Sequence, residues 1–183
     1  THNLKVHMDG ARVFNAQAAT GIPVKTYAKY ADTITFCLSK GLGCPVGSML
    51  CGTKEFISQA LTVRKLLGGG MRQTGILAAA GLYALEHHVD RLKDDHAHAK
   101  AIADTLVKTG WADVDVQGVQ TNIIFFTVPT FSAQDVVKQL ARIGILANTE
   151  GETVRLVTNL DLSDEDTQSI CSLLASFNPE VLA

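Results

Sequence analysis

The sequence predicts an α/β protein, because short strand-like segments alternate along the chain with helix-like segments. Residues 33–38 have the every-second-residue apolar pattern of a strand, and residues 54–67 have helical spacing. The same order returns near the end of the chain, where a strand-like segment precedes each of two helices. With 183 residues, 46% of them hydrophobic, the chain can form one substantial core or two small ones.

The composition excludes several classes of protein. The apolar fraction is too high and the formal charge of −2 too small for an intrinsically disordered chain. No segment approaches the roughly 20 consecutive apolar residues of a membrane helix. The balance of 16 basic against 18 acidic residues creates no large field for nucleic acid. We therefore expect neither a membrane nor a nucleic acid as a partner.

Cysteine usage bears on the compartment. The four cysteines include no CxxC pair, which is typical of reduced thiols inside a cell. We therefore expect a cytoplasmic protein. The mitochondrion is the alternative, because a targeting peptide upstream of Thr1 would not be seen.

Three strand-like segments lie in the first part of the chain. Residues 6–8 lead into Asp9, which is therefore expected at the carboxyl end of a strand. Residues 33–38 alternate between two faces. Residues 46–51 follow a turn rich in glycine and proline, so the last two strands are expected to form a hairpin-like unit with Lys40 in or near its turn.

A helix is predicted over residues 54–67. Thr53 suits its N-cap, and the triple glycine at 68–70 ends it abruptly. Apolar residues recur on one face of this helix. These residues are Phe56, Ala60, Val63 and Leu67.

Residues 73–108 also have a helical pattern, rich in alanine and leucine. This is long for one helix of a globular protein, so we expect a break near Val89 and Asp90. The charged residues that follow suit a bridge between two domains. We therefore place one domain over residues 1–90 and a second over residues 91–183.

The second domain has its own strand and helix order. Strands are predicted over residues 122–128 and 154–158, and Ser132 and Ser163 each begin a helix with capping-box spacing. Apolar residues at helical spacing are expected to point inward from these two helices. They are Val136, Leu140, Ile143, Ile170, Leu173, Leu174 and Phe177.

Lys40 is the strongest chemical signal that the residues themselves offer. It lies at a strand end in Ser39-Lys40-Gly41-Leu42-Gly43, among small and apolar neighbours that can partly desolvate its amine. Desolvation lowers the pKa of a lysine and frees it for Schiff-base chemistry. The alternative is an ordinary solvated lysine in a turn.

Asp9 is the second signal, because open α/β sheets bind ligands at the carboxyl ends of their strands. The alternative is a turn aspartate, or the N-cap of a helix that starts near Ala11. Together, Asp9 and Lys40 match the needs of pyridoxal phosphate. This cofactor takes a lysine for its aldehyde and an aspartate that keeps its ring nitrogen protonated.

Three segments resemble the low-specificity L-threonine aldolases, which are fold-type I pyridoxal-phosphate enzymes of the aspartate aminotransferase-like fold. They are residues 7–12 (HMDGAR), 39–48 (SKGLGCPVGS) and 65–73 (KLLGGGMRQ), and VRLVT at 154–158 extends the resemblance. It implies that residues 1–90 are the second half of the large cofactor-binding domain, and residues 91–183 the small carboxyl-terminal α/β domain. Members of that family carry roughly as much sequence again before the Asp9 motif, so the chain resembles their carboxyl-terminal half.

The resemblance also implies roles for charged residues near the cofactor. Lys40 would bind pyridoxal phosphate covalently, Asp9 would pair with its ring nitrogen, and Arg12 would lie beside it. Lys65 and Arg72 match a loop that approaches the site from a neighbouring subunit and helps to bind the phosphate. A homo-oligomer, a dimer or a tetramer, is therefore expected.

Arg155 looks like the arginine that binds the carboxylate of the small-molecule substrate, a β-hydroxy-α-amino acid. The implied reaction cleaves the Cα–Cβ bond of L-threonine or L-allo-threonine to give glycine and acetaldehyde. Two alternatives are another fold-type I lyase or transaminase, and a chain that is catalytically incompetent by itself.

Weaker candidates have structural explanations. His96 and His98 invite a metal site, but their spacing places them on different helical faces, so a solvated surface is favoured, as it is for His87 and His88. The triple glycine could bind phosphate, although such a run more often ends a helix. Small buried hydrophobic residues are expected at three cysteines, which are Cys37, Cys44 and Cys51.

Overall fold

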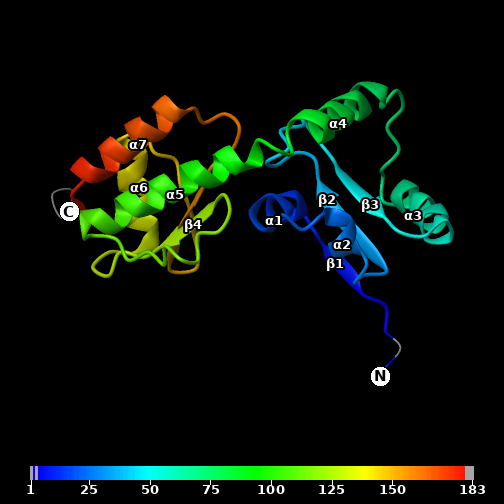
Figure 1. Cartoon of the computed structure of the whole chain (residues 1–183), viewed down its shortest axis with the longest axis horizontal. Coiled ribbons are helices and arrows are strands. Elements are labelled where there is room, and N and C mark those ends of the chain that lie inside the picture. Colours follow the sequence, from blue (N-terminus) through cyan, green and yellow to red (C-terminus); the bar gives the residue numbers. More distant parts are fainter. Residues whose placement is uncertain (1, 3, 180–183) are drawn as a thin grey trace. The chain divides into compact units, whose positions relative to one another are not determined.

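The computed structural model describes residue 2 and residues 4–179 (Figure 1). The chain divides between Leu92 and Lys93 into two compact units. The predicted domain boundary, between residues 90 and 91, lies just before this division. Both units mix helices with strands, so the α/β prediction is confirmed.

Among the described residues, the first unit forms a three-stranded sheet in the order β1 (His7–Asp9), β2 (Thr33–Cys37), β3 (Ser48–Cys51). Strands β1 and β2 are parallel, with Asp9 opposite Thr35. Strands β2 and β3 are antiparallel, as the hairpin-like prediction required. Strand β3 begins at Ser48 rather than at Val46, because Gly47 turns the backbone with a φ of 113°.

The helices of this unit are α1 (Val13–Thr20), α2 (Val24–Ala28), α3 (Lys54–Leu66) and α4 (Gly75–His87). Helix α2 was not predicted, because five residues are too few to show a clear period. Helix α3 begins where expected, since the Thr53 hydroxyl accepts a hydrogen bond from the Phe56 amide at 3.3 Å. The predicted break after α4 is also confirmed, because α5 (Leu92–Thr109) starts only at Leu92.

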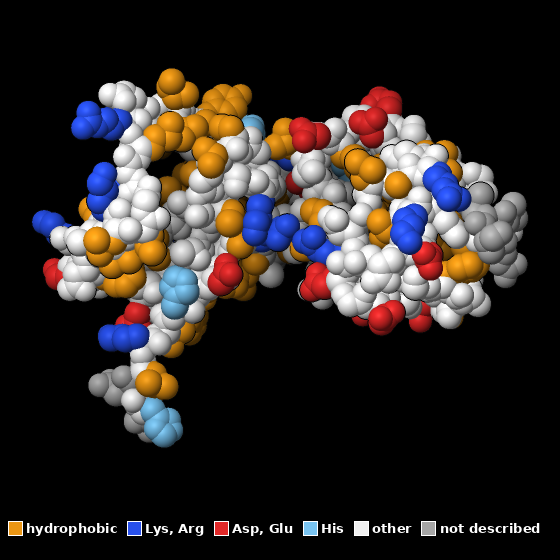
Figure 2. All heavy atoms as spheres, turned by 180° about the vertical axis from the view of Figure 1, so that it is seen from behind, with side chains coloured by type: hydrophobic (Ala, Val, Ile, Leu, Met, Phe, Trp, Pro, Cys, Tyr) orange, Lys and Arg blue, Asp and Glu red, His pale blue; other side chains and the backbone are white. Residues whose placement is uncertain are grey.

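The apolar face of α3 is not buried. No residue of the helix is buried, and Leu67, which follows it, is 82% exposed. The buried core of this unit is small and lies instead under the connection between β2 and β3. It contains Leu38, Leu42, Cys44, Ala84 and Leu92. Figure 2 shows hydrophobic side chains spread over the visible surface of this unit.

The second unit has an antiparallel sheet in the order β4 (Ile123–Phe126), β6 (Thr153–Val157), β5 (Asn148–Glu150). Strand β5 was not predicted, because its three residues are all exposed and polar. Helices α5, α6 (Ala133–Arg142) and α7 (Asp164–Ser176) contribute to one core with the sheet (Figure 1). Its buried strand residues are Ile124, Phe126, Val154 and Leu156.

The predicted helix starts of this unit are confirmed. The Ser132 hydroxyl accepts from the Asp135 amide, and Ser163 forms a full capping box with Asp166. Leu174 and Phe177 are buried as expected, whereas Leu173 is 39% exposed. Leu173 lies at the edge of the helical stripe, so it turns partly toward solvent.

Leu140→Ala should destabilise the second unit by about 2–5 kcal/mol, because Leu140 is fully buried and the change leaves a cavity. Denaturant unfolding followed by circular dichroism measures this free energy. Leu146→Ala is the matched control, since Leu146 is 85% exposed and its loss should cost no more than about 0.5 kcal/mol. Equal effects of the two substitutions would contradict the core described above.

Candidate active site

Asp9 is the last residue of β1, and its side chain is exposed. Its Oδ1 accepts a hydrogen bond from the Ala11 amide at 3.0 Å, which forms an Asx turn. The N-cap position of α1 belongs to Arg12, so Asp9 is not the helix cap. Its Oδ2 makes no hydrogen bond to any described residue, and it therefore can accept one from a ligand.

Lys40 lies in the connection between β2 and β3, as predicted. Its carbonyl accepts the Gly43 amide at 2.8 Å, which closes a β-turn with Lys40 in the first position. The side chain is exposed, so the expected partial desolvation is wrong for this chain by itself. Leu38 and Leu42, two residues before and after Lys40, are buried in the core. The Lys40 amine itself forms no hydrogen bond or ion pair with the described residues.

Asp9 is the carboxyl-terminal residue of β1, and Lys40 follows the carboxyl end of its parallel neighbour β2, so both belong to the same edge of the sheet. Backbone hydrogen bonds continue past the end of β1, from Gly10 N to Thr35 O at 2.8 Å and from Cys37 N to Ala11 O at 3.2 Å. A Cβ on Gly10 would lie 2.8 Å from the Thr35 carbonyl oxygen, so only glycine allows this approach. The following residue of the motif, Arg12, is half-buried at the start of α1.

Lys65 and Arg72 flank the glycine-rich loop between α3 and α4, and both are exposed. Gly68 has a φ of 88° and its amide bonds to the Lys65 carbonyl, so the first glycine ends the helix. The Lys65 side chain passes close to Gly70, where a Cβ would lie 3.0 Å from its Nζ.

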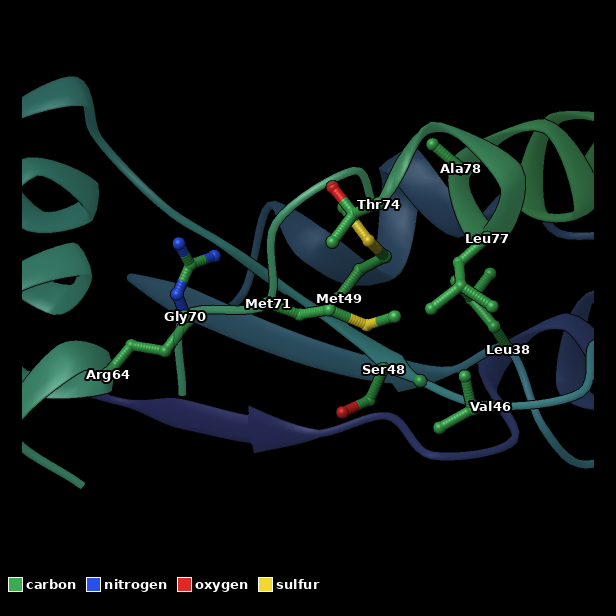
Figure 3. A pocket seen from close by; sticks show the side chains of 11 residues that line it. Leu38, Val46, Ser48, Met49, Arg64, Gly70, Met71, Thr74, Leu77 and Ala78 are labelled. Atoms are coloured by element: carbon green, nitrogen blue, oxygen red, sulfur yellow. The ribbon is translucent and has the colours of Figure 1, made fainter. Parts of the chain in front are cut away.

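A pocket of about 380 Å³ separates this loop from the connection that carries Lys40. Its lining comes from both segments and from the start of α4, and Figure 3 shows the labelled side chains. Arg64, which directly precedes Lys65, also lines the pocket, although no sequence motif pointed to it. Neither Lys65 nor Arg72 contributes to the lining.

Arg155 belongs to the second unit. It lies on β6, opposite Phe125 of β4 and Asn148 of β5. Its side chain is 22% exposed, and its Nε lies 3.7 Å from a Glu150 carboxylate oxygen. The Nε is buried without a hydrogen bond. Neighbouring residues in this strand, Val154 and Leu156, point into the core, so Arg155 is on the face of the sheet away from it.

Two of the histidines are more buried than the solvated surface position that was expected for them. His98 is only 8% exposed, and its Nε2 lies 2.8 Å from Asp164 Oδ1, so the prediction of a surface position is wrong for it. His88 is half-buried, and its Nδ1 lies 2.7 Å from the Leu42 carbonyl oxygen. In the part of the chain that the structure describes, no group of three or more His, Cys, Asp or Glu residues could hold a metal ion.

Burial singles out one of the three cysteines. Cys44 is buried and its thiol donates to the Ala80 carbonyl at 3.5 Å, whereas Cys37 and Cys51 are half-buried. Burial raises the pKa of the Cys44 thiol above its ordinary value. The expectation of a small buried residue is therefore confirmed in full only for Cys44.

The pKa of His96, on α5, should make the stability of the protein depend on pH. Desolvation lowers its pKa below the ordinary value, and the Asp95 carboxylate partly opposes this by raising it. The unfolded histidine, with a pKa of about 6.5, therefore binds more protons than the folded one in the window below that pH. The free energy of unfolding should fall as the pH is lowered through this window, and rise as it is raised.

His96→Gln should reduce this fall, because glutamine does not titrate. Denaturant unfolding of both proteins at about pH 5 and about pH 8 measures the difference. An identical dependence on pH in the variant and the parent would contradict the role of His96.

The donor set at the sheet edge fits pyridoxal phosphate. Lys40 offers a primary amine with no partner among the described residues, and Asp9 offers a carboxylate oxygen that is free to accept from a ring N–H. Arg12 adds a guanidinium three residues after Asp9. No described helix is long and apolar enough to cross a membrane.

Comparison with known proteins gives matches over most of the chain. A family model described as beta-eliminating lyase matches residues 1–129. The low specificity L-threonine aldolase of Escherichia coli (strain K12) is 44% identical over 175 residues, which cover 96% of this chain and 51% of that protein. "Probable low-specificity L-threonine aldolase 2" of Arabidopsis thaliana is also 44% identical, over 93% of this chain and 49% of that protein. The chain thus spans about half the length of these curated relatives.

A solved structure has the same course of the backbone. It comes from Exiguobacterium sp. 255-15 and is assigned as an aromatic amino acid beta-eliminating lyase/threonine aldolase. The TM-score is 0.77 at 18% identity, with 94% of this chain and 52% of that chain covered. This likeness confirms the predicted fold class.

Proposed function

Because the chain belongs to the beta-eliminating lyase family, we propose that it serves in a pyridoxal-phosphate-dependent aldolase. This enzyme cleaves the Cα–Cβ bond of L-threonine or L-allo-threonine and releases glycine and acetaldehyde. The observation that carries the proposal is the position of Asp9 and Lys40 at one edge of the β1–β2 sheet. The 44% identity to proteins named low-specificity L-threonine aldolases supports the choice of reaction.

Each of three residues has a distinct task at this edge. The Lys40 amine would hold the cofactor covalently through its aldehyde carbon until the amino group of the substrate takes its place. Asp9 would accept a hydrogen bond from the ring N–H and would keep that nitrogen protonated. Arg12 contributes positive charge beside them. When bound, pyridoxal phosphate supplies an electron sink for the pair that is released as the Cα–Cβ bond breaks.

Charged residues outside this edge have further proposed roles. Arg155 binds the substrate carboxylate, for which a guanidinium can supply two parallel hydrogen bonds. Lys65 and Arg72 bind the cofactor phosphate in a neighbouring copy. The exposed apolar surface of α3 supports a homo-oligomer, because a second copy could cover it. The molar mass of the whole protein from light scattering tests this part of the proposal.

A second candidate reaction is β-elimination, which the description of the matching family model favours. Such an enzyme would convert serine to pyruvate and ammonia, or cysteine to pyruvate, ammonia and hydrogen sulfide. Product analysis of the whole protein with each amino acid separates the two reactions. Acetaldehyde and glycine from threonine would support the aldolase, and pyruvate from serine or cysteine without cleavage of threonine would overturn it.

A further inference from the structure

A histidine far along the chain contacts the turn that carries Lys40. The Nδ1 of His88 lies 2.7 Å from the carbonyl oxygen of Leu42, although the two residues are 46 positions apart. A carbonyl oxygen only accepts, so His88 donates and its Nδ1 carries the proton. His88 follows α4 directly, and its own amide bonds to the Ala84 carbonyl at 2.8 Å, which ties it to the helix.

Backbone hydrogen bonds also hold the turn. The Lys40 carbonyl accepts the Gly43 amide at 2.8 Å, and the Leu38 carbonyl accepts the Cys44 amide at 3.0 Å. At the far end of the connection, the Gly47 carbonyl accepts the Leu38 amide at 2.9 Å and the Ser39 amide at 3.4 Å. Gly43 has a φ of 71°, so this short segment has little intrinsic preference for its conformation.

Side chains of the turn also pack against the segment around His88. Leu42 is 3% exposed and lies in one buried cluster with Ala84 of α4. A Cβ on Gly41 would lie 2.8 Å from Leu92 Cδ2, so the backbone next to Lys40 touches the start of α5. The end of α4 and the beginning of α5 thus pack against the turn. His88 adds a hydrogen bond to these apolar contacts.

We propose that His88 is a positioning residue for Lys40. Its imidazole holds the Leu42 carbonyl and thereby keeps the turn in the conformation that presents the Lys40 amine at the sheet edge. The inference rests on the proposed function, in which that amine binds pyridoxal phosphate. His87 cannot do this, because its side chain is 54% exposed and contacts Glu86 and Tyr83 instead.

The first test measures the turn without the cofactor. Hydrogen–deuterium exchange of residues 38–44 in the whole protein should be about three- to tenfold faster in His88→Leu, because the Leu42 carbonyl loses its donor. His88→Asn should restore protection, because the amide of asparagine can donate from nearly the position of Nδ1. His87→Leu, the matched control, should exchange like the parent protein.

Should His88→Leu fail to fold, His88→Gln replaces it. The glutamine amide lies one methylene further out and should not hold the carbonyl, so exchange in the turn should exceed that of His88→Asn. Exchange that is equal in the parent and in the variant without the donor would overturn the inference.

The second test measures the consequence for Lys40. Borohydride fixes pyridoxal phosphate to the lysine, and mass spectrometry of the Lys40 peptide gives the half-saturating concentration. This concentration should rise about three- to tenfold in His88→Leu and return with His88→Asn. Fixation at an unchanged concentration in His88→Leu would overturn the positioning role.

The two tests also separate the inference from the proposed function. If the parent protein fixes no pyridoxal phosphate at Lys40, the proposed function fails, and the role of His88 toward a cofactor fails with it. If the parent protein fixes pyridoxal phosphate at Lys40 and the His88 variants behave like the parent in both tests, the proposed function stands and the inference is wrong.

Discussion

Replacing Lys40 with alanine should abolish the fixation of pyridoxal phosphate and lower threonine cleavage by about 10⁴-fold or more. The amine is the group that forms and releases the covalent link, and no other lysine lies in this turn. The fold should be unaffected, because the side chain is exposed and an exposed substitution usually changes stability by no more than about 0.5 kcal/mol. Acetaldehyde release and the mass of the borohydride-treated peptide measure the two effects.

Lys54→Ala is the matched control for Lys40→Ala. Lys54 is also exposed and lies at the first position of α3, away from the sheet edge that carries Asp9. It should retain the activity and cofactor content of the parent protein. A Lys40→Ala protein that still binds the cofactor covalently and cleaves threonine at the parent rate would show that the lysine has been assigned wrongly.

Asp9→Asn should lower the rate of threonine cleavage by about 10²- to 10³-fold. Asparagine has nearly the same shape but no negative charge, so it cannot keep the ring nitrogen of the cofactor protonated. Its side-chain oxygen can still accept from the Ala11 amide, as Asp9 Oδ1 does at 3.0 Å. The Asx turn and the stability should therefore survive, and the loss should appear in kcat.

Asp115→Asn controls for the turn alone. Asp115 is exposed, and its Oδ1 accepts from the Gln117 amide at 3.1 Å in the same local arrangement. This substitution should change neither the rate nor the thermal midpoint. A rate for Asp9→Asn within about twofold of the parent would remove Asp9 from the proposed site.

Much of the secondary structure could be predicted because its signals are local. Thr53, Ser132 and Ser163 each cap a helix three residues from the amide that they bind. The glycines at 68 and 144 adopt positive φ where helices end. Helix α2 and strand β5 could not be predicted, because they are too short for their periodicity to be read.

Some features of the candidate site could likewise be predicted from the sequence, and others could not. Asp9 and Lys40 could be found from the sequence, because Asp9 ends one strand, Lys40 lies shortly after another, and the surrounding motifs are contiguous. The exposure of the Lys40 side chain and of the α3 face could not, because burial depends on which other segments cover a residue. The apolar pattern of α3 states only that one face can be covered, and the described chain leaves it open.

By itself, the sequence determined the alternation of strands and helices, the helix ends and the two residues that suit pyridoxal phosphate. These depend on the backbone preferences and hydrogen bonds of residues within a few positions of one another. Only the tertiary structure decided that β1 and β2 are parallel neighbours, that Arg64 lines a pocket, and that His88 contacts the Leu42 carbonyl. These contacts join segments that are distant in the chain, so they are decided by how the helices and strands pack.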